Sequence, residues 1–268
     1  MGLESFELTD EEVSDFDVDG FLVFENFLDE EETDLLRNIA RADRERQLGA
    51  ASRADGEGGA VKLHVENELG DDVYSAIVRS ERLALPMEQL LGDEVYHYHH
   101  KIVFKEAHVG GAWAWHQDYG YWYNNGCLFP HMASCMIAVD KATRENGCLQ
   151  VIRGSHEIGR VDHGPVGDQT GADPERVEAA LEQLELVHVE LEPGAAVMFH
   201  GNLLHRSDQN KSENARWAFI CCYNTKGNDP FKESRHPRYT PLNIGSNSAI
   251  RDVGRRQWEE LKGKAVRS

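Results

Sequence analysis

Between Val95 and Tyr223 the chain is a succession of short apolar runs that are rich in β-branched and aromatic residues. Glycine, proline and asparagine turns separate these runs, which span residues 95–105, 132–140, 148–152, 187–191, 195–200 and 216–223. Many short strands with turn signals between them are typical of a β-sandwich or a β-barrel. The pattern therefore predicts a mainly β core over about residues 95–225.

The first part of the chain is predicted to be helical around one strand. Thr9 with Glu12, and Asp29 with Glu32, have the spacing of a capping box, so each pair predicts a helix start. The second helix is expected to run to about residue 46, and a strand is expected at 21–24. Residues 50–60 are small and Gly-rich, which indicates a loop, and 72–91 read as two helical pieces broken near Pro86.

Two further helices are expected outside the β core. Asp173 has the character of an N-cap and Pro174 suits the first helical position, so residues 173–186 predict a helical insertion between strands. Residues 251–264 are compatible with a terminal helix. We expect one domain over 1–268, with helical decoration over about 1–94, the core over about 95–225 and an extension over about 226–268.

The charge balance limits the partners that the chain can have. The 28 Lys and Arg residues against 47 Asp and Glu residues give a net charge of −19. Nucleic acids and anionic membranes both require a basic face, so neither is an expected partner. The acidity fits a solvated surface, adaptation to high salt, or attraction of cationic substrates, and charge alone does not choose among them.

The compartment is expected to be the cytoplasm. No apolar run approaches the ~20 residues of a membrane span, and the chain starts with the acidic sequence MGLESFELTDEE. Its five cysteines form no CxxC pair, and an odd number without a secretory signal indicates reduced thiols. The sequence does not specify an oligomeric state.

An H-x-D motif offers a metal site. His116 and Asp118 lie two residues apart, and on a strand such residues project from the same face. His205 follows another β run, 89 residues after His116. Two histidines and one carboxylate form the facial triad of non-haem Fe(II) oxygenases, which leaves three coordination positions for co-substrate and oxygen. An isolated H-x-D also arises by chance, so its surroundings decide how much weight it has.

The residues that follow His205 add an anion-binding pattern. Arg216 lies eleven residues after His205 and opens the next strand, while Ser207 adds a hydroxyl on the same strand face as His205. A buried arginine can bind the carboxylate of a dicarboxylic acid bidentately. The alternative is a surface arginine in an ion pair.

Taken together, these residues resemble the phytanoyl-CoA dioxygenase-like family of Fe(II)/2-oxoglutarate oxygenases. The resemblance covers about residues 8–225 and includes the entry segment DGFLVFENFLDEEE, the HQD motif, the run NGCLQVIRGSH and the spacing of His205, Ser207 and Arg216. It implies a double-stranded β-helix, a cupin-like jelly roll, and iron held by His116, Asp118 and His205. It also implies that Arg216 and Ser207 hold the C5 carboxylate of 2-oxoglutarate.

The resemblance suggests two more co-substrate contacts. Family members often place one on the strand before the H-x-D motif, where Lys101 lies here, and some use a lysine further upstream, for which Lys62 is a candidate. An exposed strand lysine is the other interpretation of Lys101. Family members often have Pro-Gly-Ser-His where this chain has Arg153 before Gly154-Ser155-His156, and we expect Arg153 to lie at the surface.

Aromatic residues directly after the motif are candidates for the substrate site. Tyr119, Tyr121 and Trp122 could form a substrate wall or a cage for a quaternary ammonium group, or they could pack at the end of a strand. Three further histidines lie close together at 97, 99 and 100. Strand alternation separates His97 and His99 from His100, which argues against a second metal cluster.

The resulting prediction is an enzyme that uses Fe(II), 2-oxoglutarate and O₂ to hydroxylate a small polar metabolite, possibly a cationic one. In related halogenases the position of Asp118 is Gly or Ala, so its presence here favours hydroxylation. Amino acids, ectoine-like compounds, betaines and aminophosphonates are the expected substrate types. The alternatives are an acyl-CoA or other acyl-ester hydroxylase of the same family and a non-catalytic cupin-like binding protein.

Overall fold

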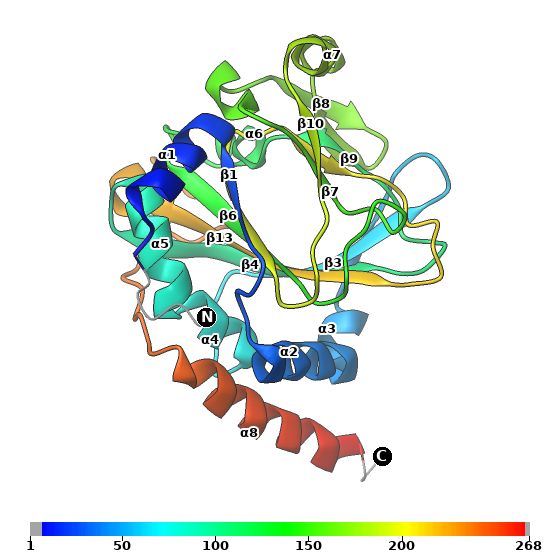
Figure 1. Ribbon diagram of the computed structural model, residues 1–268, viewed down its shortest axis with the longest axis vertical. Helices are drawn as coiled ribbons and strands as arrows, with labels where there is room; N and C mark the ends of the chain where they lie inside the picture. Colours follow the sequence, from blue (N-terminus) through cyan, green and yellow to red (C-terminus); the bar gives the residue numbers. More distant parts are fainter. Residues whose placement is uncertain (1–6, 266–268) are drawn as a thin grey trace.

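Two antiparallel sheets face each other in the computed structural model, and helices cover the outer face of the larger sheet (Figure 1). The seven-stranded sheet has the order β1-β11-β6-β13-β4-β3-β2, and the four-stranded sheet has the order β10-β7-β12-β5. The structure describes residues 7–265, so the first six residues of the acidic start lie outside it. This arrangement confirms the mainly β, jelly-roll architecture predicted from the sequence.

The strands have the following bounds: β1 (Phe21–Phe24), β2 (Ala51–Ala54), β3 (Ala60–Glu66), β4 (Val95–Lys105), β5 (Trp113–His116), β6 (Met132–Ala138), β7 (Leu149–Ile152), β8 (His163–Val166), β9 (Gln169–Ala172), β10 (Leu186–Val189), β11 (Ala196–His200), β12 (His205–Ser207) and β13 (Arg216–Thr225). The α-helices are α1 (Asp10–Asp19), α2 (Glu30–Ala42), α3 (Arg44–Leu48), α4 (Val73–Val78), α5 (Glu81–Leu91), α6 (Asp118–Trp122), α7 (Pro174–Gln183) and α8 (Ser248–Ala265). Strands β8 and β9 form a separate hairpin.

The predicted helix starts are confirmed by side-chain caps. The Thr9 side chain accepts a hydrogen bond from the backbone N–H of Glu12, and Asp29 does the same for Glu32, so both capping boxes are complete. Asp173 caps α7, with proline in its first turn. Local side-chain chemistry therefore sets where these helices begin.

Two local predictions for the N-terminal part were wrong. The segment expected to be a loop over 50–60 instead supplies β2, which pairs with β3 at the outer edge of the large sheet. Its four residues are exposed, so backbone pairing and not an apolar pattern makes them a strand. Pro86 does not break the helix either, since it lies buried inside α5 and the interruption falls at Ser80.

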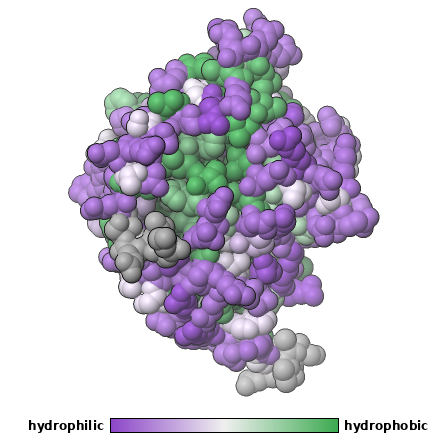
Figure 2. Space-filling view, viewed as in Figure 1, coloured by the Kyte–Doolittle hydropathy of each residue, from purple (hydrophilic) through white to green (hydrophobic). Residues whose placement is uncertain are grey.

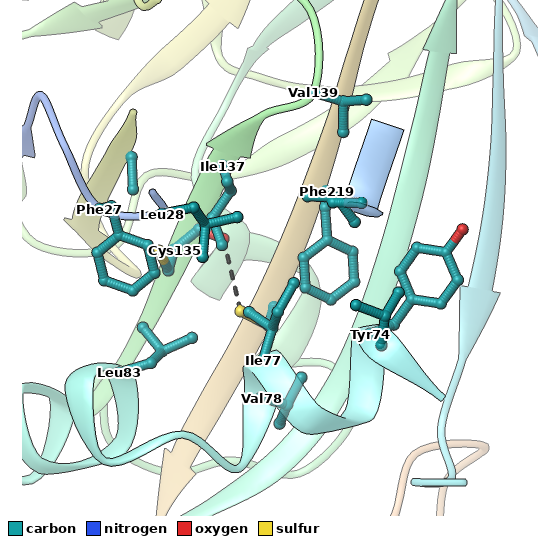
Figure 3. Packing of buried hydrophobic residues seen from close by; sticks show 14 of the residues in the cluster. Phe27, Leu28, Tyr74, Ile77, Val78, Leu83, Cys135, Ile137, Val139 and Phe219 are labelled. Atoms are coloured by element: carbon teal, nitrogen blue, oxygen red, sulfur yellow. Dashed lines mark hydrogen bonds between the residues drawn. The ribbon is translucent and has the colours of Figure 1, made fainter. Parts of the chain in front are cut away.

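The main core lies between the large sheet and its helices. Ile77 and Leu83 of the helices pack against Ile137 and Phe219 of β6 and β13 (Figure 3). Helix α8 packs against α2 and α4 on the same side. Because the helices cover only the outer face, the inner face of the sheet is left to line the space between the two sheets.

The view in Figure 2 shows a mostly hydrophilic surface with apolar side chains gathered at its centre, where the two sheets lie in Figure 1. None of the helices within residues 7–265 is long and apolar enough to cross a bilayer. All five cysteines are buried and free.

A buried ion pair fixes the start of α2 and offers a test of the fold. Arg82 donates from Nη1 to Glu32 Oε2 at 2.7 Å and from Nη2 to Glu32 Oε1 at 3.0 Å, and Glu32 is only 1% exposed. Arg82→Met removes two charged hydrogen bonds to this buried carboxylate and leaves Arg251, whose Nε lies 3.8 Å from Glu32 Oε1, so the free energy of unfolding in urea should fall by ~1.5–3 kcal/mol. Lys262→Met, which breaks an exposed pair with Glu259, should cost less than ~1 kcal/mol. Equal losses in the two variants would contradict this account.

Candidate active site

The three predicted metal ligands meet at the end of the small sheet. Strands β5 and β12 pair antiparallel with His116 directly opposite His205, and the two imidazole rings lie 4.0 Å apart. Asp118 Oδ1 lies 3.7 Å from His116 Nε2 and 3.9 Å from His205 Nε2. All three side chains are buried, and among the described residues they are the group whose ligand atoms lie close enough together to hold a metal ion.

Asp118 reaches this position in a different way from the one predicted. Strand β5 ends at His116, and Asp118 is the first residue of α6 rather than the next inward-facing strand residue. Gln117 between them is still extended, which keeps the two ligands on one side. The buried Gln117 side chain donates to the carbonyls of Gly159 and Asn202, so it ties the motif to two neighbouring loops.

Hydrogen bonds set the two imidazoles in the tautomer that a metal requires. His116 Nδ1 lies 2.9 Å from the carbonyl of Ala114, and His205 Nδ1 lies 2.9 Å from that of Leu203. A carbonyl only accepts, so each Nδ1 has the proton and each Nε2 presents a lone pair to the site.

The protonation states also suit a cation. Burial lowers the pKa of His116 and of His205 below the ordinary value, which keeps both rings neutral. Burial alone would raise the pKa of Asp118, but the charge of Lys101 and the hydrogen bond from the Ser134 hydroxyl hold it well below its usual range. Two neutral imidazoles and one carboxylate are a donor set that fits Fe(II) and leaves positions open for other ligands.

A cavity extends from the triad into the space between the two sheets. Apolar side chains form much of its wall, among them Val103, Met136, Phe199 and Ile220. Its lining also includes the cationic side chains of Lys101, Lys105, Arg206 and Arg216, whereas Asp118 is its one carboxylate. The wall is therefore positively charged although the chain as a whole is strongly acidic.

Two of these cations are deeply buried and lie side by side. Arg216 on β13 pairs in register with Lys105 on β4, and they are 4% and 0% exposed. The Arg216 guanidinium donates to the carbonyl of Gly147, and Lys105 Nζ donates to Ser207 Oγ at 2.9 Å. Within residues 7–265 neither forms an ion pair with a carboxylate.

Burial lowers the pKa of Arg216 to about 10 and lowers that of Lys105 well below its ordinary value. Buried charges are normally paired, because an unpaired one costs several kcal/mol. Two buried cations beside a hydroxyl therefore form a site that an anion would stabilise.

The lysines predicted from the sequence have different positions. Lys101 lines the cavity, as expected for a contact near the metal. Lys62 does not, because its neighbours Val61 and Leu63 face the cavity and alternation leaves Lys62 exposed on the other side. Lys105 was missed, although it follows Lys101 by four residues and therefore shares its strand face.

The predicted aromatic substrate wall is not part of the cavity lining. Tyr119 donates its hydroxyl to the carbonyls of Cys127 and Leu128, and Trp122 packs edge-on against Tyr98 in a buried cluster. Tyr121 comes nearest, since its ring lies 5.6 Å from that of His116. These residues form a short helix and not the strand end that was considered, so their rings point in several directions.

The histidines of β4 correct one more expectation. The register of β4 against β13 shifts at Tyr98, and this bulge puts His97 and His100 on one face, with their ring nitrogens 3.0 Å apart. His99 lies apart from them beside Trp122. They form no three-residue metal group within the described chain. Arg153 lies in surface ion pairs with Asp19 and Glu185, as expected.

A jelly roll whose His₂–Asp triad lines a cavity with buried cationic side chains is typical of Fe(II)/2-oxoglutarate-dependent oxygenases. Residues 16–218 match the model of the phytanoyl-CoA dioxygenase (PhyH) family. The chain belongs to this family and is an Fe(II)/2-oxoglutarate-dependent dioxygenase.

Comparison with characterised proteins gives the same class. The chain is 31% identical over 246 residues to L-proline trans-4-hydroxylase of Streptomyces griseoviridis, covering 86% of this chain and 90% of that protein. It is 28% identical over 263 residues to ectoine dioxygenase of Bordetella bronchiseptica, and the match covers 92% of this chain and 85% of that protein. The fold is similar to the crystal structure of EctD from S. alaskensis with 2-oxoglutarate and 5-hydroxyectoine, with a TM-score of 0.76 and 23% sequence identity. The match covers 90% of this chain and 89% of that chain.

The lowered histidine pKa values predict how metal binding depends on pH. Protons compete with a metal for Nε2 only near and below the folded-state pKa, which for both ligands lies below the ordinary value of 6.5. The affinity of the metal-free protein for Mn²⁺, measured by calorimetry, should fall as pH is lowered, with the midpoint of this proton competition below 6.5, the ordinary pKa of histidine. A midpoint above 6.5 would contradict the assignment of neutral, buried ligands.

Proposed function

We propose that this enzyme hydroxylates a C–H bond of a small polar metabolite that carries a carboxylate, such as an amino acid or an ectoine-like compound. The reaction consumes 2-oxoglutarate and O₂ and releases succinate and CO₂. The observation that carries the proposal is a single cavity lined by both the His₂–Asp triad and the buried Arg216–Lys105 pair. The relatives named as hydroxylases of proline and ectoine support it.

Each part of the cavity has a role in this proposal. His116, Asp118 and His205 hold the iron, which when bound supplies the oxygen chemistry. Arg216, Lys105 and Ser207 hold the C5 carboxylate of 2-oxoglutarate, which points its 2-oxo acid end at the triad. The apolar wall excludes water from the reacting groups. Lys101 presents a positive charge near the triad, where a carboxylate of the co-substrate or of the substrate would lie.

The charge of the cavity refines the expected substrate. A purely cationic substrate would meet four cationic side chains and no carboxylate other than the metal ligand Asp118. An amino acid or ectoine-like zwitterion avoids this repulsion through its carboxylate. For an acyl-CoA, the phosphates would approach a chain whose net charge is −19, which disfavours their binding. Tyr121 remains the predicted aromatic contact, since it is the ring beside His116.

The same proposal covers the setting of the enzyme. We infer that residues 1–268 act as one catalytic domain and that the protein works in the cytoplasm on a small molecule. A nucleic-acid partner is not expected at a net charge of −19.

The function is tested with a metabolite panel scored by substrate-stimulated succinate formation. Anaerobically loaded Fe(II) enzyme is mixed with 2-oxoglutarate and with proline, other amino acids, ectoine, betaines, aminophosphonates or an acyl-CoA. We expect an amino acid or ectoine-like compound to stimulate turnover, and His205→Ala to abolish it. Stimulation by the acyl-CoA alone would overturn the proposed substrate class, and a wild-type enzyme that consumes no 2-oxoglutarate with any compound would favour a binding protein.

The co-substrate site gives a second prediction. Arg216→Ala and Lys105→Met each remove a charged contact to the C5 carboxylate, worth ~1.5–3 kcal/mol, so the KM for 2-oxoglutarate should rise roughly 10–150-fold. Lys62→Met is the matched control, because Lys62 lies on the outer side of the adjacent strand, and its KM should not change. A normal KM in Lys105→Met would show that Arg216 and Ser207 suffice.

A further inference from the structure

We propose that Ser134, supported by Cys222, is a positioning residue that orients the Asp118 carboxylate so that one of its oxygens faces the metal and the other is held away. Neither residue belongs to the cavity wall or to the ligand set. The inference rests on the proposed metal site and concerns how that site is kept in shape.

The two oxygens of Asp118 have different neighbours. Oδ1 is the oxygen that lies 3.7 and 3.9 Å from the Nε2 atoms of the two histidines. Oδ2 lies 2.7 Å from Ser134 Oγ, on strand β6 of the facing sheet. A carboxylate that binds a metal only accepts hydrogen bonds, so the serine hydroxyl is the donor. A carboxylate held at Oδ2 has one oxygen free for the metal.

A second buried group supports the serine. Cys222 Sγ lies 3.2 Å from Ser134 Oγ, and the two residues are register partners on β13 and β6. The serine has one hydroxyl proton, which it donates in the hydrogen bond to the carboxylate. The thiol is therefore the donor in the hydrogen bond between Cys222 Sγ and Ser134 Oγ. Burial raises the pKa of Cys222 to about 12, which keeps the thiol protonated. The result is a hydrogen-bond relay that runs from the Cys222 thiol through the Ser134 hydroxyl to the Asp118 carboxylate.

This hydrogen-bond relay starts in a buried part of the large sheet. Ser134 and Cys222 are both 0% exposed and lie in the middle of the seven-stranded sheet, whereas Asp118 begins a five-residue helix. The sheet therefore gives a fixed anchor to a carboxylate that begins a short helix. A carboxylate bound through both oxygens would occupy one of the positions that the triad leaves open.

The neighbouring residues on the same strands supply matched controls. Cys135 and Cys221 are also fully buried, but they belong to the cluster on the opposite face of the sheet, under the helices. Figure 3 shows Cys135 beside Leu28 and Ile137. Cys221→Ala therefore removes a buried thiol next to Cys222 without changing the hydrogen-bond relay to Asp118.

The test is a calorimetric titration of the metal-free, full-length protein with Mn²⁺, without co-substrate. Loss of a partner of a metal ligand typically lowers metal affinity ~10–100-fold, and we expect this for Ser134→Ala. Cys222→Ala should lower the affinity less, Cys222→Ser should retain it because the donor is kept, and Cys221→Ala should match the wild type. The anaerobic charge-transfer absorption of the Fe(II)–2-oxoglutarate complex should change in Ser134→Ala and not in Cys221→Ala.

Wild-type affinity in Ser134→Ala, with an unchanged absorption band, would overturn the positioning role and leave the metal site intact. A wild-type protein that binds no Mn²⁺ would overturn the metal site itself, and this role with it. If Ser134→Ala does not fold, Cys222→Ala decides: an affinity below that of Cys221→Ala supports the role, and an equal affinity overturns it.

Discussion

The pairing of β5 with β12 is the interaction on which the site depends. It puts His116 opposite His205 at one end of the four-stranded sheet, although 89 residues separate them in the chain. The remaining ligand needs only one more extended residue, Gln117, before the chain turns into α6. Bonds from Gln117 to the loops around Gly159 and Asn202 hold this turn against the sheet, so the metal ligands depend on backbone that is itself buried and paired.

The second constraint is electrostatic. The chain has a net charge of −19, yet it buries Arg216 and Lys105 next to each other, each bonded to neutral acceptors and neither paired with a carboxylate within the described residues. Such an arrangement costs folding free energy unless a ligand supplies the missing anion. A dicarboxylic acid would supply this anion, and the cavity that receives it is also lined by the triad. The same argument explains why the overall acidity was a poor guide to the charge that the substrate meets.

The sequence was sufficient for what depends on local chemistry and spacing. The caps at Thr9, Asp29 and Asp173 gave the helix starts, and the H-x-D motif with His205 gave the triad that the structure brings together. Features made by pairing between distant segments were not predictable in this way. Strand β2 has no apolar pattern, the bulge at Tyr98 reverses the alternation of the β4 histidines, and Ser134 meets Asp118 only across the two sheets. Lys105 was accessible in principle, because alternation puts it on the same strand face as Lys101.

The most direct test of the account is the affinity of the anaerobic, Mn²⁺-loaded protein for 2-oxoglutarate and for 2-oxopentanoate, which keeps the 2-oxo acid group but has no C5 carboxylate. If one cavity is lined by both the metal site and the buried pair of cations, both ends of the co-substrate contribute to its binding free energy. The account then predicts that 2-oxopentanoate binds roughly 10–150-fold more weakly, which corresponds to the ~1.5–3 kcal/mol of a charged contact, and that this difference shrinks in Lys105→Met. Equal affinity for the two acids would contradict it, because Arg216 and Lys105 would then not be the site that receives the co-substrate.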